Sequence, residues 1–174
     1  MIRFLSRLGG ALALAPYLYE DVEEDESSAP QAFLIVLAAS LATGAAYFPE
    51  LGWRGLFAGS VAALTGWLAW SWLTYYIGES WLPGRNTSAD WGQLLRTTGF
   101  AAAPGVLRLI GIVPEARDPI FALTWIWMLA SFTLAVRQAL DYESLGRAVL
   151  VSALGAAVYL GVLLVLPRAC QLLG

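Results

Sequence analysis

Long hydrophobic stretches without charged residues dominate the pattern of the chain. Four such stretches cover residues 32–49, 55–78, 119–136 and 148–167, and a fifth, 97–114, is interrupted only by Arg108. Each approaches the roughly 20 residues that a helix needs to cross a hydrocarbon core about 30 Å thick. With their flanking residues, they predict five membrane spans, at about 32–49, 55–78, 94–113, 119–138 and 147–167.

These stretches predict helices, because a strand of a membrane barrel alternates apolar and polar residues, whereas 32–48 and 148–166 are apolar on every face. The fold class we expect is therefore an all-α membrane protein with five transmembrane helices in one bundle. The membrane domain would cover 32–170 and follow an N-terminal cytoplasmic or interfacial segment, 1–31. Composition agrees, since 59% of the 174 residues are hydrophobic, against about 45–50% in soluble domains.

The N-terminal segment combines an apolar stripe with arginines and then acids. Its apolar residues recur at helical spacing: Met1, Leu5, Leu8, Leu12 and Ala15. We expect a short amphipathic helix in the membrane plane, with Arg3 and Arg7 towards anionic headgroups; a poorly ordered tail is the alternative. Six of the next seven residues after Tyr19 are acidic. That acidic tract is typical of a solvated tail, or else of a docking site for a basic partner.

Arginine placement predicts the orientation, because short translocated loops disfavour positive charge. With a cytoplasmic N-terminus, six arginines lie inside and four outside, if Arg108 reaches outward to headgroup level. The inner set is Arg3, Arg7, Arg85, Arg96, Arg137 and Arg147, and the outer set is Arg54, Arg108, Arg117 and Arg168. Cationic residues that are all arginine, in an Ala- and Leu-rich chain, indicate a GC-rich bacterial genome. We therefore expect the cytoplasmic membrane, with the C-terminus outside.

Small residues and one proline are the candidate packing features. Gly55 and Gly59 form a GxxxG motif, and Ala153, Ala157 and Gly161 form a similar stripe, either within the chain or between copies. Pro104, near the middle of the third span, is expected to remove one backbone hydrogen bond and bend the helix. The bend would be either a hinge or a fixed shape.

Charges of both signs surround the last inner loop. Arg137, Asp141, Glu143 and Arg147 have spacings that permit ion pairs. One interpretation is that these pairs fix the last two spans against each other. The other is a docking surface that these residues share with the acidic tract and Arg96.

Catalytic chemistry has little support in the sequence. The chain has no histidine, no metal-ligand spacing, no phosphate-binding glycine loop and no nucleophile beside a base. We expect serines inside the spans to bond to carbonyls of their own helices; they are Ser40, Ser60, Ser71, Ser131 and Ser152. The prediction is a protein that is not an enzyme, with no cofactor, no metal and no nucleic-acid partner.

Several stretches together resemble the Yip (Ypt-interacting protein) family. They are the acidic tract with Asp25 and Pro30-Gln31-Ala32, the stretch LLRTTGFAAAP at 94–104, and VRQAL followed by LGRA within 136–148. The resemblance implies five spans and a cytosolic N-terminus. Eukaryotic members associate with Rab-type GTPases and shape endomembranes. However, their Asp-Leu-Tyr-Gly-Pro type motif is absent, with only Tyr17-Leu18-Tyr19-Glu20 nearby, so Rab binding does not carry over.

The function expected is that of a non-catalytic membrane protein of the Yip type, which organises membrane or protein complexes. Its partners would be membrane lipids and other membrane proteins or further copies of the chain. One alternative is a transporter of small molecules or lipids gated at the Pro104 bend. The other is an accessory subunit of a larger membrane complex.

Overall fold

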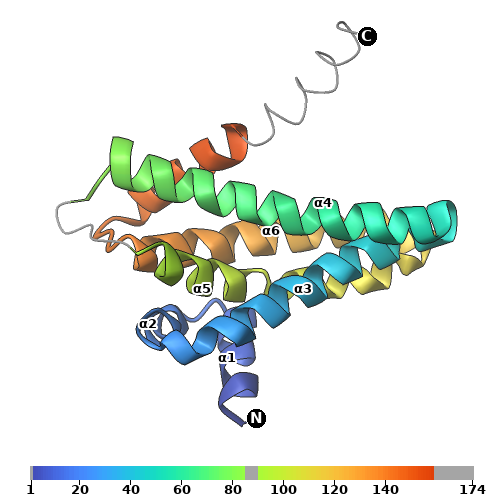
Figure 1. The fold of residues 1–174 in the computed structure, drawn as a ribbon, viewed down its shortest axis with the longest axis horizontal. Coiled ribbons are helices and arrows are strands. Elements are labelled where there is room, and N and C mark those ends of the chain that lie inside the picture. Colours follow the sequence, from blue (N-terminus) through green and yellow to red (C-terminus); the bar gives the residue numbers. More distant parts are fainter. Residues whose placement is uncertain (1, 85–89, 159–174) are drawn as a thin grey trace, which may run out of the picture.

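The computed structural model describes residues 2–84 and 90–158. In this part of the chain the regular secondary structure is entirely helical, without a strand (Figure 1). The elements in order are α1 (Ile2–Leu12), α2 (Pro16–Glu24), the 3-10 turn η1 (Glu26–Ser28), α3 (Ala29–Ala46), α4 (Phe48–Tyr76), the π turn η2 (Ile77–Trp81), α5 (Trp91–Ala101), the 3-10 helix η3 (Ala103–Ile112) and α6 (Pro114–Ala139). A last apolar helix is described over Leu145–Val158.

Within the described residues, three helices are long and apolar enough to cross a membrane: Glu26–Ala46, Phe48–Trp81 and Pro114–Ala139. They coincide with the first, second and fourth predicted spans, so the prediction of an all-helical, multi-pass membrane protein is confirmed. The third predicted span is divided between α5 and η3. The fifth coincides with Leu145–Val158, and its remainder lies outside the described residues. The number of five spans stays a prediction.

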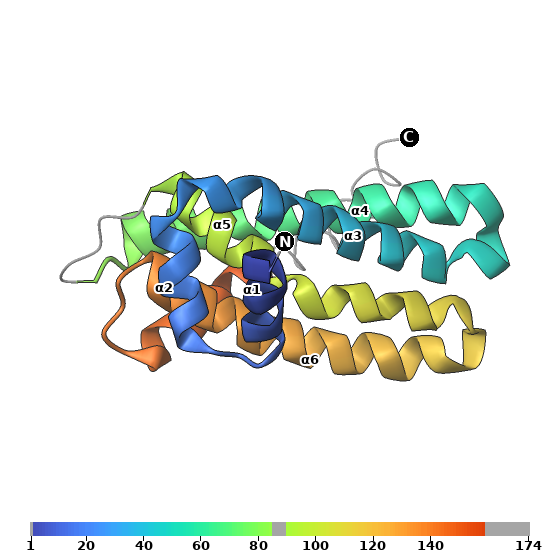
Figure 2. The same ribbon diagram turned by 90° about the horizontal axis from the view of Figure 1, so that it is seen from below.

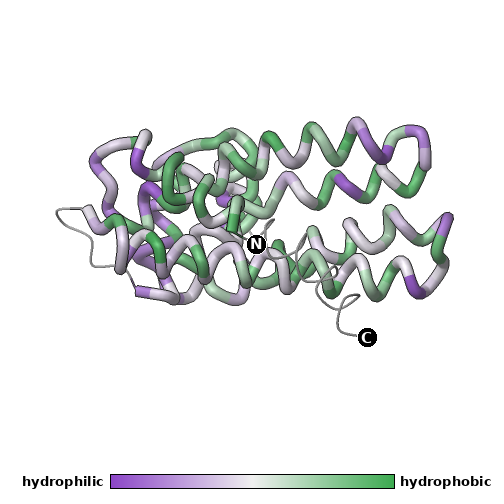
Figure 3. The backbone as a smooth tube through the Cα atoms, turned by 90° about the horizontal axis from the view of Figure 1, so that it is seen from above, coloured by the Kyte–Doolittle hydropathy of each residue, from purple (hydrophilic) through white to green (hydrophobic). Residues whose placement is uncertain are grey.

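The distribution of polar side chains suits a lipid environment. On α4, Phe57 and Val61 are 65% and 59% exposed, whereas the hydroxyl-bearing Ser71 and Thr74 are fully buried. A water-soluble helix would show the reverse, with its apolar face covered. Figure 3 shows hydrophilic residues concentrated at the two ends of the bundle, with a largely hydrophobic stretch between them.

The two ends of the bundle are built from different elements (Figure 2). We call one the polar end; it carries α2, η1, the start of α5 and the loop at 140–146. We call the other the turn end; it holds the tight connections at 47–52 and 112–114. At the first of these connections Gly52 has φ +58°, which a glycine adopts without strain and which breaks the helix direction there.

Glycines allow α3 to approach two neighbouring helices. A Cβ added to Gly59 of α4 would lie 2.9 Å from the Cα of Gly44 in α3. A Cβ on Gly105 of η3 would lie 3.0 Å from the Cβ of Ala39. Gly55 has a different role, because a Cβ there would lie 2.6 Å from the carbonyl oxygen of Tyr47 at the helix corner. Both members of the GxxxG motif therefore pack within the chain.

The small-residue stripe expected on the fifth span does not pack within the chain over its described part, and packing between copies stays a prediction. Ala153 and Ala157 are exposed, and Gly161 lies outside the described residues. Gly155 is the residue in contact, because a Cβ there would lie 2.6 Å from Thr74 Oγ1 of α4.

Pro104 lies just after a change of helix type. The α-helix α5 ends at Ala101, and the ten-residue η3 begins at Ala103. Gly105 N donates to Ala102 O at 2.9 Å, which is a 3-10 bond in place of an α-helical one. Pro104 is itself buried, and its neighbour Gly105 packs against α3 and Met128 of α6. These contacts suit a fixed shape for the segment.

The N-terminal segment differs from a solvated tail. Most of the acidic tract lies in α2 and η1, and the opposite face of α2 buries Leu18, Tyr19 and Val22 in the core shared with α3, α5 and α6. The expectation that Arg7 faces lipid headgroups is also wrong, because its side chain is only 3% exposed and points to acidic residues of the same chain. The tract is therefore partly structural.

Candidate functional site

Arg7 is the centre of an ion-pair network at the polar end. Its Nε donates to Asp21 Oδ2 at 2.6 Å and its Nη2 to Asp25 Oδ2 at 2.6 Å. Its Nη1 donates to Gln31 Oε1 at 3.2 Å. The hydrogen bonds from Ser27 and Arg7 lower the pKa of Asp25 to about 2. Arg7 thereby connects α1 to α2 and to the start of α3.

Arg96 closes the C-terminal end of α2. It is buried, and it donates from Nε to Val22 O at 3.1 Å and from Nη2 to Glu23 O at 2.5 Å. The last carbonyls of a helix have no partner within the helix, so a cation at this position is favourable. Because these contacts occupy its guanidinium, Arg96 is not part of an exposed docking surface.

Glu23 lies at the same end of α2 and has a raised pKa. Burial raises the pKa of Glu23 to about 7, the negative charge of Asp141 adds to the rise, and a hydrogen bond with Gln138 opposes it. The carboxyl therefore titrates near neutral pH at the contact between α2 and α6.

The two arginines that flank the loop between α6 and the last helix donate hydrogen bonds to backbone carbonyls. Arg137 Nε donates to Tyr142 O at 3.3 Å, and Arg147 Nη1 donates to Pro83 O at 3.0 Å. Among the described residues, no ion pair joins Arg137 or Arg147 to Asp141 or Glu143. The interpretation in which such pairs fix the last two spans is therefore wrong. Exposed pairs would in any case contribute only about 0–1 kcal/mol.

Tyr142 connects this loop to the end of α4. Its hydroxyl donates to Gly78 O at 3.1 Å and to Leu82 O at 2.9 Å, and its side chain is buried. The loop is thus held by one aromatic residue and two arginines, without a salt bridge.

A depression of about 500 Å³ lies on the polar end beside this loop. Its wall is formed by Pro16 and Glu20 of α2, by Arg137 and Gln138 of α6, and by Asp141, Tyr142 and Glu143 of the loop. Glu20, Asp141 and Glu143 are exposed carboxylates. With three exposed carboxylates against Arg137 among its lining residues, the rim carries a net negative charge.

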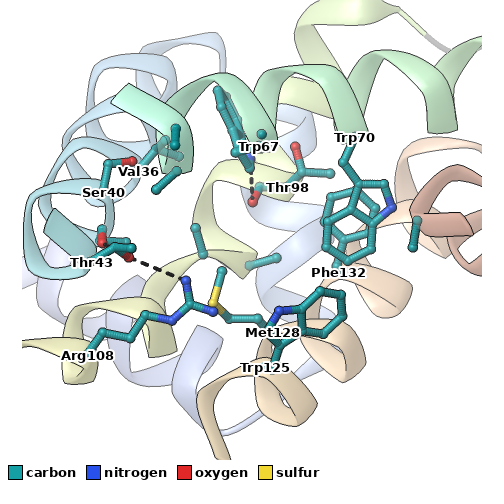
Figure 4. A pocket seen from close by; sticks show the side chains of 17 residues that line it. Val36, Ser40, Thr43, Trp67, Trp70, Thr98, Arg108, Trp125, Met128 and Phe132 are labelled. Atoms are coloured by element: carbon teal, nitrogen blue, oxygen red, sulfur yellow. Dashed lines mark hydrogen bonds between the residues drawn. The ribbon is translucent and has the colours of Figure 1, made fainter. Parts of the chain in front are cut away.

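A second hollow, the bundle cavity, lies between α3, α4, η3 and α6 and has a volume of about 150 Å³ (Figure 4). Arg108 lines it, together with Ser40, Thr43 and several aromatic residues. Its Nε donates to Thr124 Oγ1 at 3.1 Å and its Nη1 to Thr43 Oγ1 at 3.3 Å. The expectation that Arg108 reaches outward to headgroup level is therefore wrong, because its side chain is directed into the bundle.

Two interior serines bridge helices, where bonds to their own helix carbonyls were expected. Tyr19 and Ser131 share a hydrogen bond of 2.6 Å between α2 and α6, and Ser71 and Thr98 share one of 3.2 Å between α4 and α5. Threonines make the local bonds instead, as Thr43 does to Ala39 O at 2.9 Å. Sequence alone does not separate these two uses of a hydroxyl group.

The side chains of the polar-end depression and of the bundle cavity favour the binding of charged ligands. Within residues 2–84 and 90–158, no group of three or more His, Cys, Asp or Glu side chains could hold a metal ion. The carboxylates of the polar-end depression offer charge to a cation, and Arg108 offers N–H groups to an anion in the bundle cavity. Of the sequence-predicted site residues, the structure brings Arg137 and Asp141 together at one depression and places Arg108 in the other hollow. It leaves Arg147 against Pro83 and Gly55 at the helix corner.

Comparison with curated proteins and with solved structures finds no match. The sequence model of the Yip1 domain, by contrast, matches residues 15–166, which cover all of the described helices from α2 onward. The match includes both the polar-end depression and the bundle cavity. The chain therefore belongs to the Yip1 domain family.

Proposed function

We propose that this Yip-type protein organises a membrane complex by docking a cationic segment of a partner protein on its polar end, without catalysing a reaction. The observation that carries the proposal is the acidic rim of the polar-end depression, formed by Glu20, Asp141 and Glu143. Opposite charges steer association and favour partners of the right sign. Arg137 and Arg147 each donate to a backbone carbonyl, and the three carboxylates of the rim outnumber Arg137, the cation that lines the depression.

Five spans in the bacterial cytoplasmic membrane, with the N-terminus inside, are part of the proposal. The eleven residues of α5 and the ten of η3 give a combined length of about 35 Å if they are nearly collinear, which is enough to cross the hydrocarbon core. The polar end holds Arg3, Arg7 and Arg96, with Arg137 and Arg147 beside the loop, whereas Arg54 and Arg117 lie at the turn end. This asymmetry supports a cytoplasmic polar end.

The orientation can be tested with the single thiol, Cys170, which lies outside the described residues. In intact cells, a membrane-impermeant maleimide should label Cys170 from the outer face, and a C170S variant should give no signal. Labelling that requires permeabilised cells would reverse the proposed orientation.

The docking role can be tested by extraction in a mild detergent and mass spectrometry of whatever co-purifies in fixed stoichiometry. A triple variant, with Glu20→Gln, Asp141→Asn and Glu143→Gln, should lose that partner, whereas Glu115→Gln at the turn end should retain it. Binding should also weaken with increasing salt, because the charges are exposed. Unchanged binding by the triple variant, or a monomer that carries only lipid, would contradict the proposal.

A further inference from the structure

The bundle cavity contains an arginine whose charge has no acidic partner. All thirteen acidic side chains of the chain lie in the described residues, and none of them forms an ion pair with Arg108. A guanidinium group carries five N–H donors, and its contacts here are two neutral threonine hydroxyls and the ring of Phe121, whose centroid lies 4.9 Å from Cζ. These contacts hold the guanidinium in place, but no acidic side chain of the described residues neutralises its charge.

The threonines hold Arg108 in a fixed direction. Thr43 Oγ1 donates to Ala39 O at 2.9 Å, and Thr124 Oγ1 donates to Ile120 O at 2.8 Å. Each hydroxyl hydrogen is therefore directed at its own helix, and each oxygen is left to accept from Arg108. Figure 4 shows the guanidinium directed into the cavity from this position. Among the described residues nothing accepts a hydrogen bond from Nη2, which is available to a bound group.

A charged group inside an apolar membrane bundle is unfavourable unless it is paired or hydrated. Arg108 lies four residues before the end of η3, which places it about 8 Å from that end at the rise of a 3-10 helix. The other cavity walls are mostly apolar and aromatic, and they include Trp67, Trp70 and Trp125. These surroundings favour an anion that brings hydrocarbon with it over a freely hydrated ion.

The size and position of the cavity fit the head of an amphiphile. Its volume of about 150 Å³ equals the space of roughly five water molecules, which accommodates a carboxylate or a phosphate group. Figure 2 shows one hairpin of α3 with α4 and another of η3 with α6, and residues of both line the cavity. The α4 helix packs mainly along α3, and its Trp70 stacks on Trp125 and Phe132 of α6, so an acyl chain would have to leave the cavity on the turn-end side of these rings.

We propose that the bundle cavity binds the oxyanion of an anionic membrane amphiphile through Arg108, with the threonines Thr43 and Thr124 as positioning residues. The same oxyanion chemistry comes from the carboxylate of a free fatty acid or from the phosphate of an anionic phospholipid. Neither the cavity nor Arg108 depends on a partner at the polar end, so this binding site can exist whether or not the proposed docking role is correct.

The test uses the full-length protein, purified in a non-ionic detergent and titrated with oleate, phosphatidylglycerol, oleyl alcohol or inorganic phosphate. Binding is followed by native mass spectrometry and by quenching of tryptophan fluorescence with a brominated form of the bound amphiphile. We expect saturable binding of oleate or phosphatidylglycerol, with the tighter of the two identifying the source of the oxyanion. Equal binding of oleyl alcohol, or inorganic phosphate as the only bound species, would overturn the proposal.

Matched variants test whether binding depends on Arg108 in particular. Arg108→Gln should weaken binding by at least about tenfold, since it removes a charged hydrogen-bond donor, and Arg108→Lys should restore part of the affinity. Arg117→Gln, which removes another turn-end arginine, should leave the affinity unchanged. If Arg108→Gln does not fold, Ser40→Leu serves as a second variant, because it fills the cavity while keeping the arginine. Wild-type affinity in either folded variant would refute the site.

Discussion

The contact between α3 and α4 at Gly44 gives the most direct test of the packing. A Cβ at position 44 would lie 2.9 Å from the backbone nitrogen of Ser60, and closer still to Ser60 Oγ and to the carbonyl oxygen of Leu56. Two of these three atoms belong to the backbone, so no side-chain rotation can make room for the added methyl group. Gly44→Ala must therefore push the two helices apart.

The magnitude follows from two opposing effects. Overpacking of a tight contact costs about 1–3 kcal/mol, and replacing glycine by alanine inside a helix returns up to about 1 kcal/mol. With backbone atoms in the way we expect the upper half of that cost, which leaves a net destabilisation of about 2 kcal/mol. For a chain of this size that corresponds to an apparent Tm lowered by roughly 4–8 °C.

The assay is thermal unfolding in detergent, followed by tryptophan fluorescence. Gly9→Ala is the matched control, since a Cβ at Gly9 meets nothing within 4 Å and the same helix-propensity gain applies. We expect this control to keep or raise the apparent Tm. A Gly44→Ala variant as stable as the wild type would refute the close approach of α3 and α4.

Three further substitutions test the polar end. Arg7→Gln should reduce the free energy of unfolding by about 2 kcal/mol in denaturant titrations, because Arg7 is buried and its two carboxylate partners are only partly exposed. Its control, Arg3→Gln, changes a side chain that is 65% exposed and should cost less than about 1 kcal/mol. The pKa of Glu23 is raised to about 7 in the folded state, so its stabilising contribution is complete below its unfolded pKa and is lost as the pH rises through about 7. The pH profile of Tm should therefore be flatter in Glu23→Gln between pH 4.5 and 8, and should change much less in Glu24→Gln, whose charge is a smaller cause of the raised pKa than burial. Tyr142→Phe removes two hydrogen bonds to backbone carbonyls and should lower stability by about 1 kcal/mol, with faster proteolysis of the adjoining loop.

Hydrophobic periodicity predicts the membrane helices of this chain well, because an uncharged run of about 20 residues has few alternatives in lipid. It predicts less about how those helices are built. Pro104 indicated an irregularity in the third span, but the consequence in the structure is a change to a ten-residue 3-10 helix, a length that is uncommon and that composition does not reveal.

Contacts between helices were harder to predict for a related reason. Gly55 and Gly59 stand out because they form a familiar motif, yet closer approaches of α3 are made at Gly44, to α4, and at Gly99, where a Cβ would lie 2.8 Å from the Cβ of Ala32. No local pattern marks those two glycines, since each matters only through the residue opposite to it. The acidic tract misled in the same way: its charges suggest solvation, while Leu18 and Tyr19 just before it and Val22 within it face the core.

The close contacts of α3 also explain why a cavity exists in the bundle. Gly44 brings α3 against α4, and Ala39 brings it against Gly105 of η3, so α3 lies between two neighbours that are not in close contact with each other. Aromatic side chains of α4 and α6, among them Trp70 and Phe132 with ring centroids 4.0 Å apart, join the two hairpins nearer the polar end. The space left towards the turn end is the place that Arg108 occupies. A substitution that separates α3 from α4 should therefore enlarge the cavity as well as destabilise the bundle, so Gly44→Ala should change amphiphile binding even though Gly44 does not line the site.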